Sequence, residues 1–161
     1  MRYKRWANEL IYASVAELPA EALDAPRSIV FGSLLRTLNH TCAMDLVWQA
    51  HLQGRDHGLT TRNPADCPGF DEVFERQREL DDWYVTYADS LAKTAEDEIV
   101  DFAFIGGGQG SMSRRDILLH VVNHGTYHRG NVTAILYDCD VNPPTTDYPV
   151  FIRQQAVANA G

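Results

Sequence analysis

The sequence RRDILLHVVNHGTYHRGNVTAILY, residues 114–137, gives the clearest helical signal in the chain. Its apolar residues recur at the three- and four-residue spacing of a helix face, so we expect one long helix from Arg114 to about Tyr137. Ser113, with Asp116 three residues later, has the arrangement of a helix N-cap and predicts where this helix begins.

Three histidines recur within this helix at intervals of four residues: His120, His124 and His128. At 100° per residue, Ile117 and Ile135 point in the same direction and define the centre of the core-facing stripe. His124 and His128 lie about 20° to either side of that centre, whereas His120 lies about 60° away. Two inward-facing imidazoles need polar partners, because a buried unsatisfied polar group costs about 1 to 3 kcal/mol. A shared metal ion would satisfy both rings; ordinary hydrogen bonds between core histidines are the alternative.

A third metal ligand is expected from a facing helix. His40 lies in the middle of a helical segment, on a stripe with Met44 and Val47. His51 is on the same stripe but lies about 16 Å from His40 along the axis, too far to share one ion. Catalytic zinc sites have three protein ligands and one open position, whereas structural sites have four. The sequence therefore predicts a site of the catalytic type, formed by three histidines: His40, His124 and His128.

The other candidate ligands fit this site less well. His57 lies in loop sequence and is expected to face solvent, and His120 is expected to flank the site. Cys42 points about 200° away from the histidine on its own helix, and Cys139 lies about 16 Å beyond the last histidine. We interpret both thiols as core residues. For Arg129 we expect a surface salt bridge.

Helical periodicity dominates the rest of the chain as well. We expect a first helix that ends before Pro19, a second over about 29–52 and a third over about 70–91. The stripe of the first helix consists of residues at helical spacing: Tyr3, Ala7, Leu10, Ser14 and Leu18. These segments and the helix at 114–137 predict an all-α fold, an antiparallel four-helix bundle.

The segments between the helices have different compositions. Residues 21–28 and 54–69 are rich in turn-forming residues and predict a turn and a loop. The run IVDFAFI, 99–105, predicts a strand or a short β-hairpin between the third and fourth helices. The GGGQG that follows lacks the lysine of a phosphate-binding loop, so we interpret it as a flexible connection. The final dozen residues are expected to form a short helix or a tail.

The composition limits the classes of function. The chain has 161 residues and no composition break, so we expect a single domain, 1–161. With 14 Lys and Arg against 22 Asp and Glu, its net charge of −8 disfavours nucleic acid as a partner. There is no apolar run of membrane-spanning length. The three cysteines form no CxxC pair, and we expect a soluble protein in the cytoplasm.

Four stretches of the chain resemble the DinB/YfiT-like metalloenzyme superfamily. They are YKRWANEL (3–10), FGSLLRTLNHTCAMDLVW (31–48), LLHVVNHGTYHRGN (118–131) and TDYPVFIR (146–153). The resemblance implies a four-helix bundle, a metal bound by His40, His124 and His128, and a homodimer. Two positions depart from the pattern, because Tyr127 replaces a histidine found in many relatives and Asn131 replaces the usual glutamine.

A divalent ion with three neutral imidazole ligands and one open position suits two kinds of enzyme. The first is a transferase in which a low-molecular-weight thiol attacks a small electrophile, as in characterised thiol transferases of the superfamily. The second is a hydrolase of a small amide or ester, although the HExxH glutamate of zinc peptidases is absent. A non-enzymatic protein that binds a metal or a small ligand is the third possibility. We expect zinc or nickel as the metal, although three imidazoles also suit copper and iron.

Overall fold

The computed structural model describes residues 1–158 and contains mostly helices. In chain order the elements are α1 (Arg2–Val15), α2 (Ala20–Asp24), α3 (Leu34–Leu52), α4 (Phe70–Ser90), the 3-10 turn η1 (Lys93–Ala95), β1 (Ile99–Ala103), β2 (Gln109–Ser113), α5 (Arg114–Asp138) and α6 (Tyr148–Ala158). The predicted bundle and the hairpin before its last long helix are confirmed. No helix within residues 1–158 is long and apolar enough to cross a membrane.

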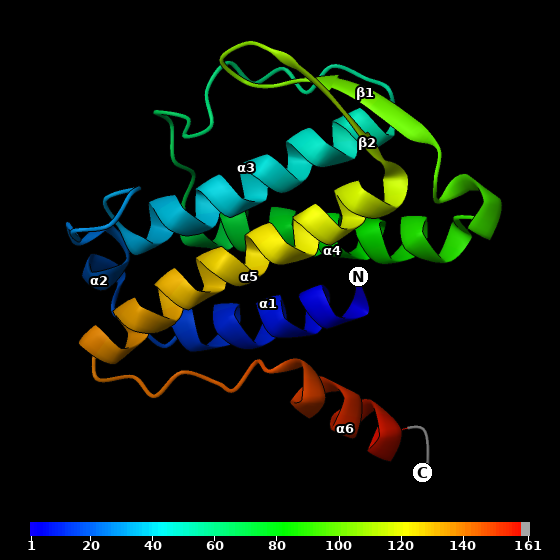
Figure 1. Ribbon diagram of the computed structural model, residues 1–161. Coiled ribbons are helices and arrows are strands. Elements are labelled where there is room, and N and C mark those ends of the chain that lie inside the picture. Colours follow the sequence, from blue (N-terminus) through cyan, green and yellow to red (C-terminus); the bar gives the residue numbers. More distant parts are fainter. Residues whose placement is uncertain (159–161) are drawn as a thin grey trace.

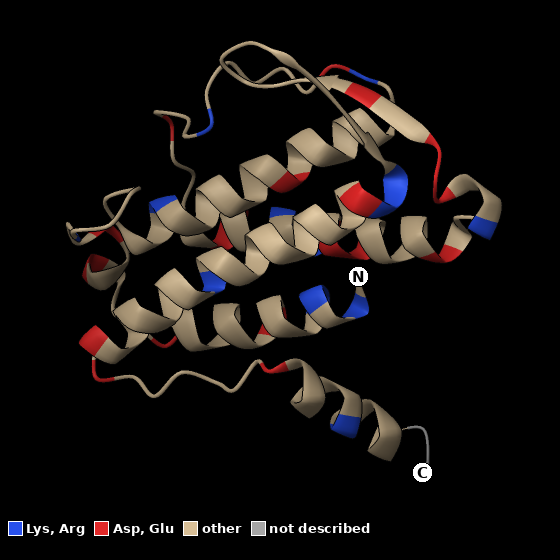
Figure 2. Cartoon of the chain, in the orientation of Figure 1, with Lys and Arg blue, Asp and Glu red and all other residues tan. Residues whose placement is uncertain are grey.

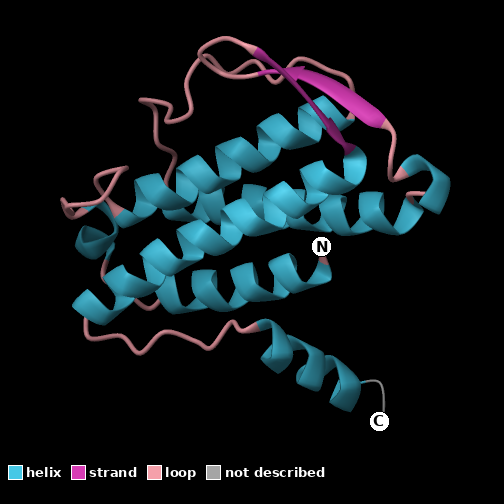
Figure 3. Cartoon of the chain, in the orientation of Figure 1, coloured by secondary structure: helices cyan, strands magenta, loops and turns pink. Residues whose placement is uncertain are grey.

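Four long helices form the bundle, in which α3 contacts α4 and α5, and α1 contacts the same two helices (Figure 1). The α3–α5 and α1–α4 pairs are antiparallel. The long connection over residues 53–69 returns the chain to the start of α3, so that α3 and α4 run in the same direction (Figure 1). This connection lies over one side of the bundle, beside the hairpin (Figure 3).

α3 begins at Leu34, five residues later than the sequence predicts. Gly32 has a positive φ of 82°, which a helix does not permit, and the Ser33 side chain then caps the helix by accepting a hydrogen bond from the Arg36 backbone N–H at 3.2 Å. The prediction that the helix covers 29–52 is therefore wrong at its start. As a result, Phe31 lies in the turn before α3, which leaves its ring free to pack against the side of that helix.

The core-facing stripe of α1 also differs from the prediction. Tyr3, Leu10 and Ser14 are only half-buried, and the helix ends at Val15. The buried residues share a stripe about one position further along the helix: Lys4, Ala7, Asn8, Ile11, Tyr12 and Val15. The prediction failed because the true stripe includes two polar residues, which periodicity analysis assigns to the surface. Residues 20–24, predicted as part of a turn, form the short helix α2.

The core of the bundle has a polar layer between two apolar clusters. The larger apolar cluster includes Leu38, Val73 and Ile135, and the smaller one, at the hairpin end, includes Leu52, Tyr84 and Ile117. The buried polar residues between them come from all four long helices and include Lys4, Asn8, His40, Asp45, Gln77, Asp81, His128 and Arg129. Outside the core, α6 packs against α1 through Phe151, which contacts Tyr3 and Trp6.

The β-hairpin packs against α3 and α5 and has a glycine turn. β1 and β2 are antiparallel, with Phe102 opposite Gly110. Three consecutive glycines, 106–108, have positive φ values of 95°, 104° and 94°, and Gly107 N–H donates to the Phe104 carbonyl at 3.0 Å. The three glycines of GGGQG therefore form the turn of the hairpin, and the Gln109 and Gly110 that follow belong to β2. A Cβ on Gly110 would lie 2.7 Å from the Phe102 ring, so the glycine lets that ring lie flat against the strand.

The predicted N-cap of α5 is confirmed. The Ser113 hydroxyl accepts a hydrogen bond from the Asp116 backbone N–H at 3.1 Å. We expect Ser113→Ala to lower the free energy of unfolding by about 1 kcal/mol, because the first turn loses its capping acceptor. Ser111, exposed on the same strand, is the control, and its replacement by Ala should change stability by less than about 0.5 kcal/mol. Urea denaturation of both variants checks this, and equal midpoints would contradict it.

Candidate metal centre

Three histidine rings from two helices converge in the bundle. His40 projects from α3, and His124 and His128 project from consecutive turns of α5. The Nε2 atom of His124 lies 3.3 Å from Nε2 of His40 and 3.1 Å from Nε2 of His128. One ring nitrogen from each histidine lies within 4.8 Å of the other two, and two of the three rings are buried. The structure therefore brings together the three histidines proposed as ligands from the sequence.

Two of the three nitrogen pairs have the separation expected for ligands of a tetrahedral cation. Imidazole nitrogens bind zinc at about 2.0 to 2.1 Å, so that two ligands of a tetrahedron are separated by about 3.3 Å. The two Nε2–Nε2 distances, 3.3 and 3.1 Å, are close to that separation. The nitrogens of the third pair, His40 and His128, lie within 4.8 Å of each other. A tetrahedral ion with three histidine ligands has a fourth corner for a small molecule.

The protons on these rings favour a cation over hydrogen bonds alone. The Nδ1 atom of His40 lies 2.6 Å from the Arg62 backbone carbonyl oxygen and must donate to it, so its Nε2 carries a lone pair. If Nε2 of His124 carries a proton and donates it to His40, the same atom cannot accept a hydrogen bond from His128. If Nε2 of His124 instead accepts from His128, its lone pair faces the lone pair of His40 Nε2 at 3.3 Å. Three neutral rings can therefore satisfy only one of the two short contacts, whereas a cation satisfies both.

The surroundings keep all three rings neutral. Burial, followed by the proximity of His128 and His40, lowers the pKa of His124 to about 3. Burial, followed by the proximity of His40, lowers the pKa of His128 to about 4. Burial also lowers the pKa of His40, although the Arg62 carbonyl opposes the shift. Because only the neutral imidazole has a lone pair for a metal, near neutral pH no proton competes for these nitrogens.

The family profile described as the DinB family matches residues 1–159. This chain belongs to the DinB family. It is 28% identical over 156 residues to Protein DinB of Bacillus subtilis (strain 168), an alignment that covers 93% of this chain and 90% of that protein. The crystal structure of a DinB-like protein from Bacillus cereus ATCC 10987 has the same fold, with a TM-score of 0.66 at 19% identity; the match covers 87% of this chain and 90% of that one.

Two positions beside the cluster differ from the pattern expected for DinB proteins. Tyr127 is exposed, and its ring lies 4.9 Å from that of His128. The amide nitrogen Nδ2 of Asn131 lies 3.4 Å from Nδ1 of His128. For His128 to present a lone pair at Nε2, Nδ1 must carry the proton, so Asn131 must turn its amide oxygen toward the ring. Asn131 can thus orient His128 as the Arg62 carbonyl orients His40.

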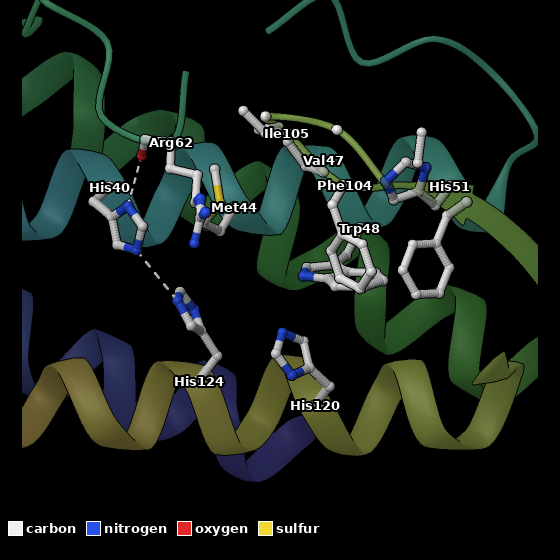
Figure 4. Close-up of a pocket in the computed structure, with 14 residues that line it drawn as sticks. His40, Met44, Val47, Trp48, His51, Arg62, Phe104, Ile105, His120 and His124 are labelled. Carbon is white, nitrogen blue, oxygen red and sulfur yellow. Dashed lines mark hydrogen bonds between the residues drawn. The ribbon is translucent and has the colours of Figure 1, made fainter. Parts of the chain in front are cut away.

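A pocket of about 430 Å³ opens beside the cluster in this DinB-family protein, and His40 and His124 form one end of it (Figure 4). Its walls come from α3, α5 and the hairpin, and they are mainly apolar: Met44, Val47, Trp48, Phe102, Phe104 and Ile105. The volume is within the range of sites that bind small molecules, about 300 to 1,000 Å³. The corner left open by the three nitrogens can therefore be reached by a ligand.

The remaining histidines line or border this pocket and do not join the cluster. The His120 ring lies 5.7 Å from that of His124 and packs against Trp48 at 4.8 Å. His51 lies at the opposite end of the pocket from His40 (Figure 4). His57, predicted to face solvent, is partly buried and packs edge-on against His51 at 5.4 Å.

A buried ionic network lies next to the cluster and was missed by sequence analysis. Lys4 of α1 is fully buried and forms ion pairs with Asp45 of α3, at 2.6 Å, and with Asp81 of α4. Asn8 donates to Asp81 at 2.8 Å, and Gln77 donates to Asp45 at 2.8 Å. Burial alone would lower the pKa of Lys4, but the two carboxylates outweigh it and raise the pKa.

Arg129 is part of this network, and the prediction that it forms a surface salt bridge is wrong. Its guanidinium is buried and donates to Asn8 at 3.0 Å and to Thr126 at 2.8 Å. Gly125 makes this arrangement possible, because a Cβ there would lie 3.2 Å from an Arg129 nitrogen and 3.6 Å from Cε of Lys4. The network thereby connects all four long helices.

Phe31 supports the metal cluster from the turn before α3. Its ring stacks on His40 with centroids 4.0 Å apart and lies 5.5 Å from that of His128. We expect Phe31→Ala to weaken metal binding about 10-fold, because neighbours that orient a ligand contribute 10- to 100-fold to affinity. Val30, which is 83% exposed, is the control, and Val30→Ala should leave the affinity unchanged. Chelator competition measures both, and equal affinities would contradict the role of Phe31.

Proposed function

We propose that this protein is a metal-dependent transferase that joins a low-molecular-weight thiol to a small electrophile, with His40, His124 and His128 as the metal ligands. The observation that carries the proposal is the convergence of three neutral imidazoles at the end of a pocket of about 430 Å³. A divalent cation held in this way retains its full charge and, when bound, lowers the pKa of a thiol that reaches its open position.

The residues around the site have defined parts in this proposal. The Arg62 carbonyl holds the proton of His40 at Nδ1 and so keeps the Nε2 lone pair of that ring free. Asn131 would do the same for His128 with its amide oxygen, in place of its amide nitrogen, turned toward Nδ1. The apolar wall formed by Met44, Val47 and Trp48 excludes water from a bound thiolate. In the reaction, the sulfur bonds to the electrophilic carbon, the leaving group departs with its electron pair, and the thiol proton passes to solvent.

The pocket favours thiol transfer over hydrolysis. Among residues 1–158, no aspartate or glutamate lines the pocket, so a carboxylate base for the activation of water has no place beside the cluster. One observation supports hydrolysis of a small amide or ester as the second candidate. His120 is a half-buried imidazole in the pocket wall, 5.7 Å from the His124 ring, and could accept a proton from water.

Activity assays with the wild type and one variant distinguish these functions. We expect the zinc- or nickel-loaded protein to accelerate the reaction of a panel of thiols with monochlorobimane, and we expect treatment with a chelator to remove this activity. His120→Ala should retain thiol transfer, because sulfur needs no base once the thiol is ionised. If the loaded protein hydrolyses small esters instead, and His120→Ala abolishes that hydrolysis, the second candidate is correct. Inactivity with every thiol and ester would exclude both.

A further inference from the structure

The side chains that line the pocket beside the histidine cluster change from one end to the other. One end contains His40, His124 and Arg62, and the other end contains His51, with Trp48 between them (Figure 4). Phe102, Phe104 and Ile105 of the hairpin form the opposite wall. The tip of the hairpin, 102–110, carries no charged residue (Figure 2). The pocket therefore combines a polar end at His40, His124 and Arg62 with an apolar wall from the hairpin.

The cluster end is positively charged. Arg62 is the one lining residue with a formal charge among those that the structure describes, and its backbone carbonyl is bonded to His40. Its guanidinium forms no ion pair with any residue of 1–158. The Arg62 guanidinium therefore favours a negatively charged group at this end, and a metal ion bound by the histidines, as proposed above, would strengthen that preference.

The body of the pocket is aromatic. The Trp48 ring packs at about right angles against three neighbours: Phe102 at 4.9 Å, His120 at 4.8 Å and His51 at 5.5 Å. Phe104 packs edge-on against Phe102 at 5.1 Å and is still 52% exposed at the mouth. Rings arranged in this way offer both faces and edges to a further ring.

We propose that the pocket binds a small aromatic anion, with its thiolate or carboxylate head at the His40–His124–Arg62 end and its ring against Trp48 and Phe104. The position of the head rests on the proposed function, because the metal attracts it. The preference for a ring does not, because Trp48 and the hairpin supply it. Arg62, Trp48 and Phe104 are thus residues that determine substrate specificity.

Three probes separate the head from the ring. Phenylacetate and acetate share the carboxylate and differ by the ring; phenylacetate and phenylacetamide share the ring and differ in charge. We expect the zinc-loaded full chain to bind phenylacetate at least 10-fold more tightly than either of the others, as measured by NMR titration of the Trp48 indole signal. Equal affinity for phenylacetate and acetate would overturn the preference for a ring, and equal affinity for phenylacetate and phenylacetamide would overturn the preference for an anion.

Matched variants assign these preferences to residues. Phe104→Ala should reduce the affinity for phenylacetate at least 3-fold, whereas Tyr137→Ala, which removes an exposed ring outside the pocket, should not change it. Arg62→Gln should reduce the affinity for phenylacetate but not for phenylacetamide, with Arg55→Gln in the same loop as the control. If Phe104→Ala and Tyr137→Ala have the same affinity, or Arg62→Gln and Arg55→Gln do, the assignment is wrong.

Measurement of the zinc content of each sample shows whether the proposed function or the inference about the pocket has failed. If the wild-type chain takes up neither zinc nor nickel, the proposed function fails. Phenylacetate must then still bind the metal-free chain more tightly than acetate, or the inference about the pocket fails as well. If zinc binds normally and the chain does not prefer phenylacetate, only the inference about the pocket fails.

Discussion

Replacement of His124 by Ala is expected to remove the metal from this protein. The Nε2 atom of His124 lies between the other two ligands, 3.3 Å from that of His40 and 3.1 Å from that of His128. Its loss leaves two nitrogens on different helices, so the affinity should fall by more than the roughly 10- to 100-fold that an orienting neighbour contributes. Elemental analysis after gel filtration should find metal in the wild type and almost none in His124→Ala.

His120→Ala is the matched control for this experiment. It removes an imidazole from the same helix, one turn away, whose ring contacts Trp48 and His124 but lies outside the cluster. We expect it to retain the wild-type metal content. If the two variants lose metal equally, His120 belongs to the site and the set of three ligands is wrong. Circular dichroism on both variants establishes that the helices are intact.

Lys4→Met is expected to cause the largest loss of stability. Methionine retains the aliphatic length of lysine but leaves Asp45 and Asp81 buried without their shared cation. Removal of one partner from a buried ion pair costs about 3 to 5 kcal/mol, because the remaining charge is uncompensated. Urea denaturation should therefore show a large fall in the midpoint. Asp81→Asn in the Lys4→Met background should recover part of it, since one of the unpaired carboxylates is then neutral.

Arg5→Met is the control on the same helix. Arg5 pairs with Glu9 and Asp82, and both of these pairs are exposed to solvent, so we expect a change of less than about 1 kcal/mol. A Lys4→Met variant as stable as Arg5→Met would contradict the importance of the network.

The stability of Lys4→Met should also depend on pH. Burial raises the pKa of Asp45 already in the wild type, although Lys4 opposes this shift. A carboxyl group whose pKa is higher in the folded state penalises folding above that pKa, and the penalty disappears as pH falls through it. Without Lys4 the pKa of Asp45 should rise further. The loss of unfolding free energy in Lys4→Met, relative to the wild type, should therefore be smaller at pH 5 than at pH 7. A loss that is the same at both pH values would point to lost packing instead.

The sequence alone predicted the bundle, the hairpin and the positions of the three histidines, for identifiable reasons. The helix α5 has strong periodicity and a serine cap, and its isoleucines define which side faces the core. An i, i+4 pair of histidines on that side is conspicuous because both residues are polar. The position of His40 in the middle of α3 then indicates which part of α3 faces His124 and His128 of α5.

The rest of the polar core could not be predicted in the same way. Periodicity analysis treats Lys4, Asn8 and Arg129 as surface residues, yet each is buried because its partner comes from another helix. A signal did exist in Asp45, an isolated carboxylate within the apolar stretch CAMDLVW, which requires a buried cation. Which cation it would meet depends on how α1 packs, and a single sequence does not specify that.

The separation of the ionic network from the histidine cluster has a consequence for how such proteins change over time. Lys4, Asp45, Asp81 and Asn8, together with Arg129, connect the four helices without any contribution from His40 or His124. We therefore expect the four helices to remain packed with or without a metal ion at the histidines, and we expect substitutions along the pocket to leave the fold intact. Under the proposed function, this division of the core would let substrate preference change one mutation at a time.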